Sequence, residues 1–228
     1  MTGPIWLDPE GDPEAFPPCE YALDEPAGLL AVGGDLRPAR VLAAYRRGIF
    51  PWYSPGQPIL WWSPDPREVL FPHEFRRTRS LEKRERNAGF EIRIDTEFAA
   101  VIDACAAPRD GVAGTWITEE MRNAYLELHA LGVGHSIETW QGDRLVGGLY
   151  GLQLGRVFFG ESMFSRAADA SKVALSALVR AAPLRDIALI DCQLPSAHLA
   201  TLGSRALPRE EFLALLAELI GPAPTYFD

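Results

Sequence analysis

The chain has 228 residues, 47% of them hydrophobic and 23% charged, with a formal net charge of −9 at pH 7. This length allows a substantial hydrophobic core, and no apolar run approaches the roughly 20 residues of a membrane-spanning helix. Three cysteines without close spacing and an acidic N-terminus argue against a disulfide framework and a signal peptide, which indicates a cytoplasmic protein.

The first part of the chain is rich in proline, tryptophan and glycine. Its centre reads "GLLAVGGDLRPARVLAAYRRGIFPWYSPGQPILWWSPDP". A short helix is predicted from Pro38 to Arg47, with Asp35 near its start and Gly48 at its end. We therefore predict a small, loop-rich N-terminal domain over residues 1–65, packed on a larger domain over residues 66–228.

A basic segment follows, "RRTRSLEKRER" at residues 76–86, with six bases and two acids in an otherwise acidic chain. One interpretation is a solvated, charged helix face. The other is a surface that contacts phosphate groups of a nucleic acid.

The remainder alternates helices and strands. "TEEMRNAYLELHALG" predicts a helix capped by Thr118 and ended by Gly132. "HSIETW", "RLVGGLYGLQ" and "RVFFGESMF" predict three strands joined by tight turns, hence an antiparallel meander. "DASKVALSALVRAA" predicts a second helix, "IALIDCQL" another strand and "PREEFLALLAELIG" a last helix. The predicted fold class is mixed α/β, with a mainly antiparallel sheet and flanking helices.

The strand "IALIDCQL" ends on Asp191, Cys192 and Gln193. Side chains alternate between the faces of a strand, so Asp191 and Gln193 are predicted on one face and Cys192 on the other. The acid and the amide then line a cleft, or else face water at the end of the strand. Cys192 is predicted to be a small core residue rather than a nucleophile.

"FFGESMFS", residues 158–165, resembles the G-x-S-x-G nucleophile elbow. Phe164 stands where the elbow needs glycine, so Ser162 is a poor candidate nucleophile. The glycine beside Glu161 also suggests a β-bulge. The histidines and cysteines show no metal-ligand spacing, and no P-loop occurs, so no metal or nucleotide cofactor is predicted.

Several motifs together resemble those of one family, the bacterial leucyl/phenylalanyl-tRNA–protein transferases. They are "GLLAVGGDL", "AYRRGIFPWYSPGQPILWWSPDPR", "GTWIT", "HSIE", "LVGGLYG", "FFGESMFSR", "ASK" and "LIDCQL", in order over roughly residues 26–213. The resemblance implies a small N-terminal domain followed by an acetyltransferase-like (GNAT-like) domain. It also implies a monomeric, cytoplasmic enzyme that moves leucine or phenylalanine from Leu-tRNA or Phe-tRNA onto a protein's N-terminal arginine or lysine. That addition marks the protein for degradation by the N-degron pathway, and it needs no cofactor.

The resemblance also implies roles for individual residues. Gln193 accepts an N–H of the attacking amine, while Asp191 orients Gln193 or finally takes the proton of the amine. Glu161 binds the cationic side chain of the acceptor or takes a direct catalytic part. The other expected contacts are Phe158, Met163, Leu149 and Trp116 for the aminoacyl pocket, Trp52 and Tyr45 for the terminal adenosine, and Arg76, Arg77, Arg79, Lys83 and Arg84 for the tRNA. Leu149 departs from the methionine expected there, so the preference among leucine, phenylalanine and methionine stays open.

Two other functions fit parts of the sequence. A CoA-dependent N-acetyltransferase of the same fold would need a pyrophosphate-binding loop near "SRAADASK", where both glycine positions hold other residues. A non-catalytic tRNA-binding module would explain the basic segment alone.

Overall fold

A computed structural model describes residues 3–108 and 116–221 of the chain. Within residues 5–62, four short strands form one sheet in the order β1-β2-β4-β3, with β1 and β2 parallel and the other pairs antiparallel. The prediction of a small, loop-rich domain with one helix therefore missed these strands. The elements are β1 (Ile5–Leu7), a 3-10 turn (Cys19–Tyr21), β2 (Leu29–Gly33), α1 (Pro38–Arg46), β3 (Phe50–Pro51) and β4 (Leu60–Trp62).

Helix α1 has the predicted bounds to within one residue. Its last turn is closed by the N–H of Ile49, which donates to the carbonyl of Ala44 at 2.9 Å. Gly48 adopts a φ of 72° there, a conformation that glycine reaches without steric cost. Asp35 accepts the backbone N–H of Arg37 just before the helix, which confirms its predicted place near the start.

The second sheet has seven strands in the order β11-β5-β10-β9-β8-β7-β6. The predicted meander β7-β8-β9 is confirmed, and all pairs are antiparallel except β9 and β10, which α5 connects. Strands β5, β6 and β11 and helices α3 and α6 were not predicted, whereas α2 falls in the basic segment for which a helix was one of two interpretations. The elements are β5 (Arg67–Leu70), a 3-10 turn (Pro72–Glu74), α2 (Arg79–Asn87), β6 (Glu91–Ile94), α3 (Phe98–Ala106), α4 (Glu119–Ala130), β7 (Gly134–Gln141), β8 (Arg144–Leu154), β9 (Val157–Ser165), α5 (Ala170–Ala181), β10 (Leu189–Gln193), α6 (Ala197–Thr201), β11 (Arg205–Leu207) and α7 (Arg209–Ile220). The mixed α/β class with flanking helices is confirmed.

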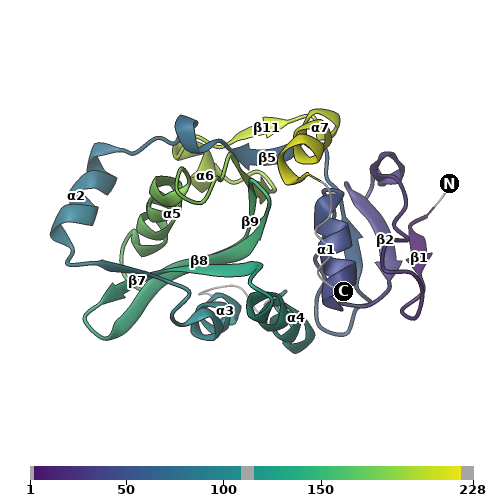
Figure 1. Ribbon diagram of the computed structural model, residues 1–228, viewed down its shortest axis with the longest axis horizontal. Coiled ribbons are helices and arrows are strands. Elements are labelled where there is room, and N and C mark those ends of the chain that lie inside the picture. Colours follow the sequence, from purple (N-terminus) through teal and green to yellow (C-terminus); the bar gives the residue numbers. More distant parts are fainter. Residues whose placement is uncertain (1–2, 109–115, 222–228) are drawn as a thin grey trace.

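Helices cover both faces of this sheet, with α3 and α4 on one face and α5 on the other (Figure 1). The pleat of the strands divides consecutive apolar residues between the two faces. Phe159 and Leu189 pack with α3 and α4, whereas their neighbours Phe158 and Ile190 pack with α5. A strand that is apolar at every position, such as "IALI", is thus explained by burial on both sides.

The two sheets share one hydrophobic cluster. Trp61 and Tyr45 from the first sheet and α1 lie in the same cluster as Tyr125 of α4 and Phe212 of α7. The predicted boundary at residues 65 and 66 falls between β4 and β5, where one sheet ends and the other begins. The division into two domains remains a prediction, since the core is continuous across it.

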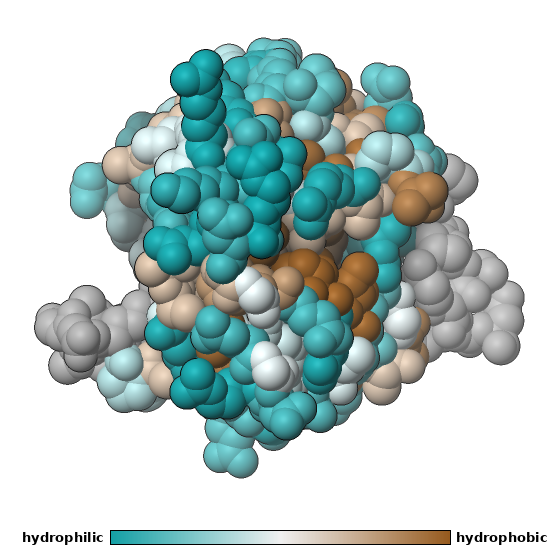
Figure 2. Space-filling view, turned by 90° about the vertical axis from the view of Figure 1, so that its left-hand side faces the viewer, coloured by the Kyte–Doolittle hydropathy of each residue, from teal (hydrophilic) through white to brown (hydrophobic). Residues whose placement is uncertain are grey.

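The predicted basic segment lies mainly on α2, at one end of the molecule (Figure 1). Figure 2 views that end, and its surface is mainly hydrophilic around an apolar hollow. Within the described ranges, no helix is long and apolar enough to cross a bilayer.

Candidate active site

The site lies where the parallel strands β9 and β10 diverge. β9 and β10 pair only from Val157 and Leu189 as far as Phe159 and Asp191. Beyond that point β9 continues to Ser165 while β10 ends at Gln193. A cavity of about 710 Å³ lies between the diverging segments, a volume suited to a small-molecule group.

Each strand carries a β-bulge at this divergence. Gly151 pairs with Gly160 and Tyr150 with Ser162, so Glu161 is the extra residue on β9. A Cβ at Gly151 would lie 2.0 Å from the carbonyl oxygen of Phe159, so only glycine permits this close approach. The bulge suggested by the sequence is confirmed, and it aims Glu161 away from the regular pleat.

The bulge on β10 changes the predicted faces of the strand end. Asp191 pairs with Val69 and Gln193 with Glu68, which leaves Cys192 as the extra residue. Gln193 has a φ of 59°, a left-handed conformation uncommon outside glycine. The prediction that Asp191 and Gln193 point together into a cleft with Cys192 hidden behind them is therefore wrong, because it assumed an unbroken pleat.

Asp191 is sealed inside the protein. Its side chain is 0% exposed and accepts two hydrogen bonds from the guanidinium of Arg67, at 2.8 and 2.7 Å. It also accepts the backbone N–H of Gln193 at 2.9 Å. Arg67 lies between the rings of Phe50 and Phe212 and donates to the carbonyl of Gly48. Asp191 therefore holds the backbone of Gln193 and does not reach either cavity.

Cys192 and Gln193 line the large cavity instead. Burial, with the nearby carboxylates of Asp191 and Glu68, raises the pKa of the Cys192 thiol far above its ordinary value. A thiol that stays protonated is a poor nucleophile, so the prediction of no catalytic role for Cys192 fits its chemistry although its predicted face was wrong.

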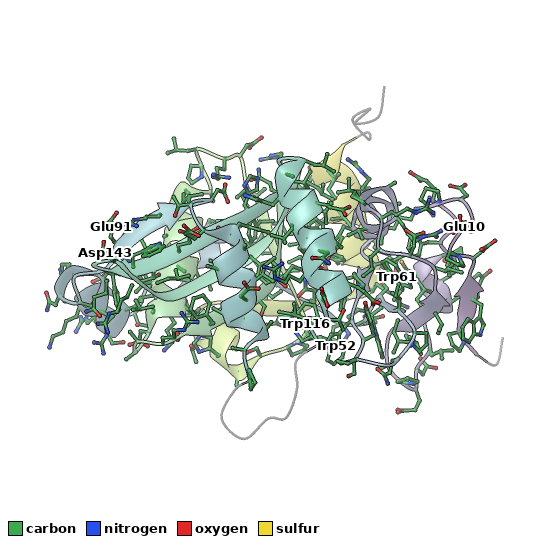
Figure 3. All side chains as sticks on the ribbon, turned by 90° about the horizontal axis from the view of Figure 1, so that it is seen from below. Glu10, Trp52, Trp61, Glu91, Trp116 and Asp143 are labelled. Carbon is green, nitrogen blue, oxygen red and sulfur yellow. The ribbon has the colours of Figure 1, made fainter. Side chains whose placement is uncertain are left out.

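A second cavity of about 200 Å³ adjoins the first. It is lined by Phe50, Pro51, Trp52, Trp116 and Leu194, and it shares Glu161 and Gln193 with the large cavity. Trp52 is 40% exposed, and Figure 3 shows it close to Trp116. The carboxyl and the amide thus stand where an aromatic cavity meets a larger, mainly apolar one.

Three hydrogen bonds hold Glu161. Its Oε1 lies 2.7 Å from the hydroxyl of Tyr45 and accepts from the amide nitrogen of Gln193 at 3.1 Å, and its Oε2 lies 2.7 Å from the hydroxyl of Tyr125. Although it touches both cavities, protein surrounds it closely. Loss of water raises the pKa of Glu161 to about 7, against the opposing effect of the tyrosine hydrogen bonds. This carboxyl therefore changes charge near neutral pH.

Tyr45 has a different place from the one expected. Its side chain is 0% exposed, and its ring packs edge-on against Phe159. It cannot stack on an adenosine in this structure, because no face of the ring is open; its hydroxyl binds Glu161 from behind. Only Trp52 of the expected adenosine contacts lines a cavity.

The residues expected to form the aminoacyl pocket are divided between the two adjoining cavities. Leu149, Phe158 and Met163 line the large cavity, and Trp116 lines the small one. The expectations missed other apolar residues of the large cavity, among them Leu175, Leu178 and Ile190. They missed Arg67 and Tyr125 as well, because nothing in the sequence links Arg67 to Asp191 124 residues away.

The basic segment is partly neutralised. Arg77 is paired with Glu82 and Glu85, and Arg84 with Asp169 before α5. Among the described residues, Arg76, Arg79 and Lys83 have no ion pair, so they remain available for an anionic partner. Arg84 connects α2 to α5, whose residues Leu175 and Leu178 line the large cavity.

Comparison with known proteins shows the family of the chain. Residues 69–217 match the family model described as leucyl/phenylalanyl-tRNA protein transferase, and residues 34–65 match the model of its N-terminal domain. A transferase from Azoarcus sp. (strain BH72) of that name is 60% identical over 221 residues, 96% of this chain and 93% of its own. Another of that name, from Stutzerimonas stutzeri (strain A1501), is 58% identical over 93% of each chain.

The molecule is thus an aminoacyltransferase, an enzyme rather than a binding module. The chain belongs to the leucyl/phenylalanyl-tRNA–protein transferase family. Solved structures are more distant: L-PGS from Bacillus licheniformis aligns over 70% of this chain and 66% of its own at 10% identity with a TM-score of 0.42. A GCN5-related N-acetyltransferase from Kribbella flavida aligns over 74% of this chain and 59% of its own at 12% identity with a TM-score of 0.38.

Proposed function

We propose that this enzyme transfers leucine or phenylalanine from its tRNA to the N-terminal arginine or lysine of acceptor proteins, which marks them for degradation. One observation carries the proposal: the aromatic cavity and the apolar cavity meet at Glu161 and Gln193. The terminal adenosine would occupy the first, the aminoacyl side chain the second, and the ester between them would lie at the two polar groups.

The reaction itself needs no energy source, since the aminoacyl ester is already activated. The acceptor's α-amine attacks the ester carbonyl, a C–N bond forms, and the bond from the carbonyl carbon to the ribose oxygen breaks. The amine loses one proton and the ribose oxygen gains one. Holding the two reactants in register supplies about 7–11 kcal/mol toward the barrier.

Gln193 is placed to orient the amine. Its amide nitrogen donates to Glu161, so its carbonyl oxygen points elsewhere and can accept an N–H of the attacking amine. A neutral acceptor favours the reactive, unprotonated amine more than a carboxylate would. Asp191 acts through Gln193 by fixing its backbone N–H, while both carboxyl oxygens of Asp191 accept hydrogen bonds from Arg67.

Glu161 would recognise the cationic side chain of the acceptor. It reaches both cavities and is the acidic side chain among the described residues that line them. The hydrogen bonds of Tyr45 and Tyr125 fix its direction. A long side chain with a positive end would therefore be favoured over an apolar one.

The tRNA would be bound by stacking and by charge. Base–aromatic stacking, here on Trp52, is worth about 1–3 kcal/mol per base. Arg76, Arg79 and Lys83 near the start of α2 would contact the backbone of the acceptor stem without reading its sequence. We propose that the enzyme is active as a monomer, in the cytoplasm where charged tRNA is found.

The test is transfer of labelled leucine from Leu-tRNA to an arginine-initiated peptide. Gln193→Ala is expected to lower kcat/KM at least about 100-fold, because the amine loses its orienting group. Cys192→Ala, one residue away, is the matched control and keeps most of the activity. A folded Gln193→Ala enzyme with full activity, or a dead Cys192→Ala enzyme, would contradict the assignment.

A further inference from the structure

Four oxygen atoms from three side chains are linked by three short contacts behind the site. The hydroxyls of Tyr45 and Tyr125 are 2.7 Å apart, and each is 2.7 Å from one carboxyl oxygen of Glu161. All three distances are typical of O–H···O hydrogen bonds. Each such contact needs one proton between its two oxygens.

Two tyrosines supply only two protons for these three contacts. If both hydroxyls donate to an ionised Glu161, the 2.7 Å contact between them has no proton and brings two lone pairs together. If Glu161 is protonated, its own O–H supplies the third proton. The three hydrogen bonds then form a closed ring, and this holds for either direction of donation around it.

We propose that Tyr45, Tyr125 and Glu161 form a closed ring of three hydrogen bonds in which Glu161 is a neutral acid, and that acceptor binding opens this ring with release of one proton. The second half rests on the proposed function, since it takes the acceptor's cationic side chain as the group that approaches Glu161. The first half rests on the geometry of the ring alone.

The surroundings of Glu161 support a neutral carboxyl in the empty site. Four elements face it with titratable groups: α1 with Tyr45, α4 with Tyr125, β8 with Tyr150, and β10 with Asp191. β5 adds the guanidinium of Arg67, which favours the charged form of Glu161. Because Asp191 holds that guanidinium in a bidentate pair, its help to Glu161 is reduced, and loss of water has the larger effect.

A cation that enters the site shifts the protonation equilibrium of Glu161 toward the carboxylate. A guanidinium or ammonium group beside Glu161 favours the carboxylate, so the proton leaves to solvent through the cavities as the positive charge enters. The net charge of the site is unchanged, which avoids a buried, unpaired charge at either stage. Both hydroxyls then donate to the carboxylate, and the contact between Tyr45 and Tyr125 lengthens.

The titration of Glu161 can be followed by NMR on full-length protein labelled with ¹³C at the glutamate carboxyls. Glu161→Gln identifies the signal by its loss. The expected midpoint in the free enzyme is near pH 7, whereas an ordinary glutamate titrates near 4.3. A midpoint near 4.3 would overturn the ring.

The effect of acceptor binding on this midpoint is tested with two peptides that differ only at the first residue. Saturation with an arginine-initiated peptide is expected to lower the midpoint by at least one pH unit, and an alanine-initiated peptide is expected to leave it in place. An unchanged midpoint with bound arginine-initiated peptide would overturn proton release. If the enzyme transfers leucine but Glu161 titrates near 4.3, the ring is refuted and the proposed function is kept. If Glu161 titrates near 7 but no leucine is transferred, the ring is kept and the proposed function is refuted.

Two phenylalanine variants separate the ring from simple burial. Tyr45→Phe opens the ring and removes the contact between the two hydroxyls that lacks a proton when Glu161 is ionised, so the ring predicts that the midpoint falls by about one unit. A rise in the midpoint would mean that Tyr45 acts only as a donor to the carboxylate, which would overturn the ring. Tyr150→Phe is the matched control. The Tyr150 hydroxyl has no hydrogen-bond partner in the described part of the chain, so its removal leaves the midpoint in place. Equal shifts in both variants would contradict the role of Tyr45.

Discussion

Two carboxyl groups on adjacent strands, one buried and one half-buried, have opposite surroundings. Asp191 on β10 faces a guanidinium in a sealed space between aromatic rings. Glu161 on β9 faces two tyrosine hydroxyls and two cavities. Protein atoms replace most of the water around both groups, but only Asp191 forms an ion pair with a positively charged side chain.

The difference separates a structural task from a chemical one. An acid paired with arginine can hold its neighbours in place, as Asp191 holds the backbone of Gln193. An acid surrounded by neutral donors has its pKa near 7 and can change charge during a reaction cycle. Two carboxyl groups whose environments differ in this way can serve one site without competing for the same role.

The largest expected effect comes from breaking the sealed pair. Arg67→Met leaves Asp191 buried without its counter-charge, which is expected to lower the free energy of unfolding by about 3–5 kcal/mol. Urea denaturation measures this loss. Adding Asp191→Asn to the same chain should recover part of it, because a neutral amide needs no counter-charge.

A matched pair on the surface gives the control for that experiment. Arg122 on α4 also meets a carboxylate, Asp103 of α3, through two nitrogens, but the Asp103 side chain is 54% exposed. Arg122→Met is expected to cost at most about 1 kcal/mol. Equal losses at Arg67 and Arg122 would show that burial does not distinguish the two pairs.

The second effect depends on pH. The folded-state pKa of Glu161 is raised from 4.5 to about 7, so between these values the folded state binds more protons than the unfolded state. Stability from this group is full below pH 4.5 and is lost as pH rises toward 7. Glu161→Gln removes the titration. Relative to the wild type, the variant should therefore gain about 3 kcal/mol between pH 4.5 and pH 8.

Denaturation of both proteins across that pH range checks the prediction. Parallel curves for the wild type and Glu161→Gln would mean that Glu161 keeps an ordinary pKa in the folded state. The contrast with Asp191 would then rest on geometry alone.

The smallest effect compares two tyrosines of the same cluster. Tyr45→Phe removes a hydroxyl that bonds both Glu161 and Tyr125, and it is expected to cost about 1–3 kcal/mol. Tyr150→Phe removes a buried hydroxyl without a partner among the described residues, so its cost should lie within about 0.5 kcal/mol of zero. A larger loss at Tyr150 than at Tyr45, measured by thermal unfolding, would contradict the hydrogen-bond ring.

The sequence by itself determined the elements whose signals are local. The meander β7-β8-β9, helices α4, α5 and α7 and the turn at Gly48 follow from residue periodicity, capping residues and glycine, which act within a few residues. Family membership was also readable, because the motifs quoted from the sequence stand in a fixed order. The bulge at Glu161 could be suspected from one glycine beside one acid.

Only the tertiary structure decided which side chains share the site. The bulge at Cys192 separates Gln193 from Asp191: Asp191 is sealed inside the protein, whereas Cys192 and Gln193 both line the large cavity. Arg67 and Tyr45 come from segments more than 100 residues away from their partners on β9 and β10. Burial and charge pairing are properties of groups that meet in space, so a pattern along the chain cannot tell which of two acids is sealed and which one titrates.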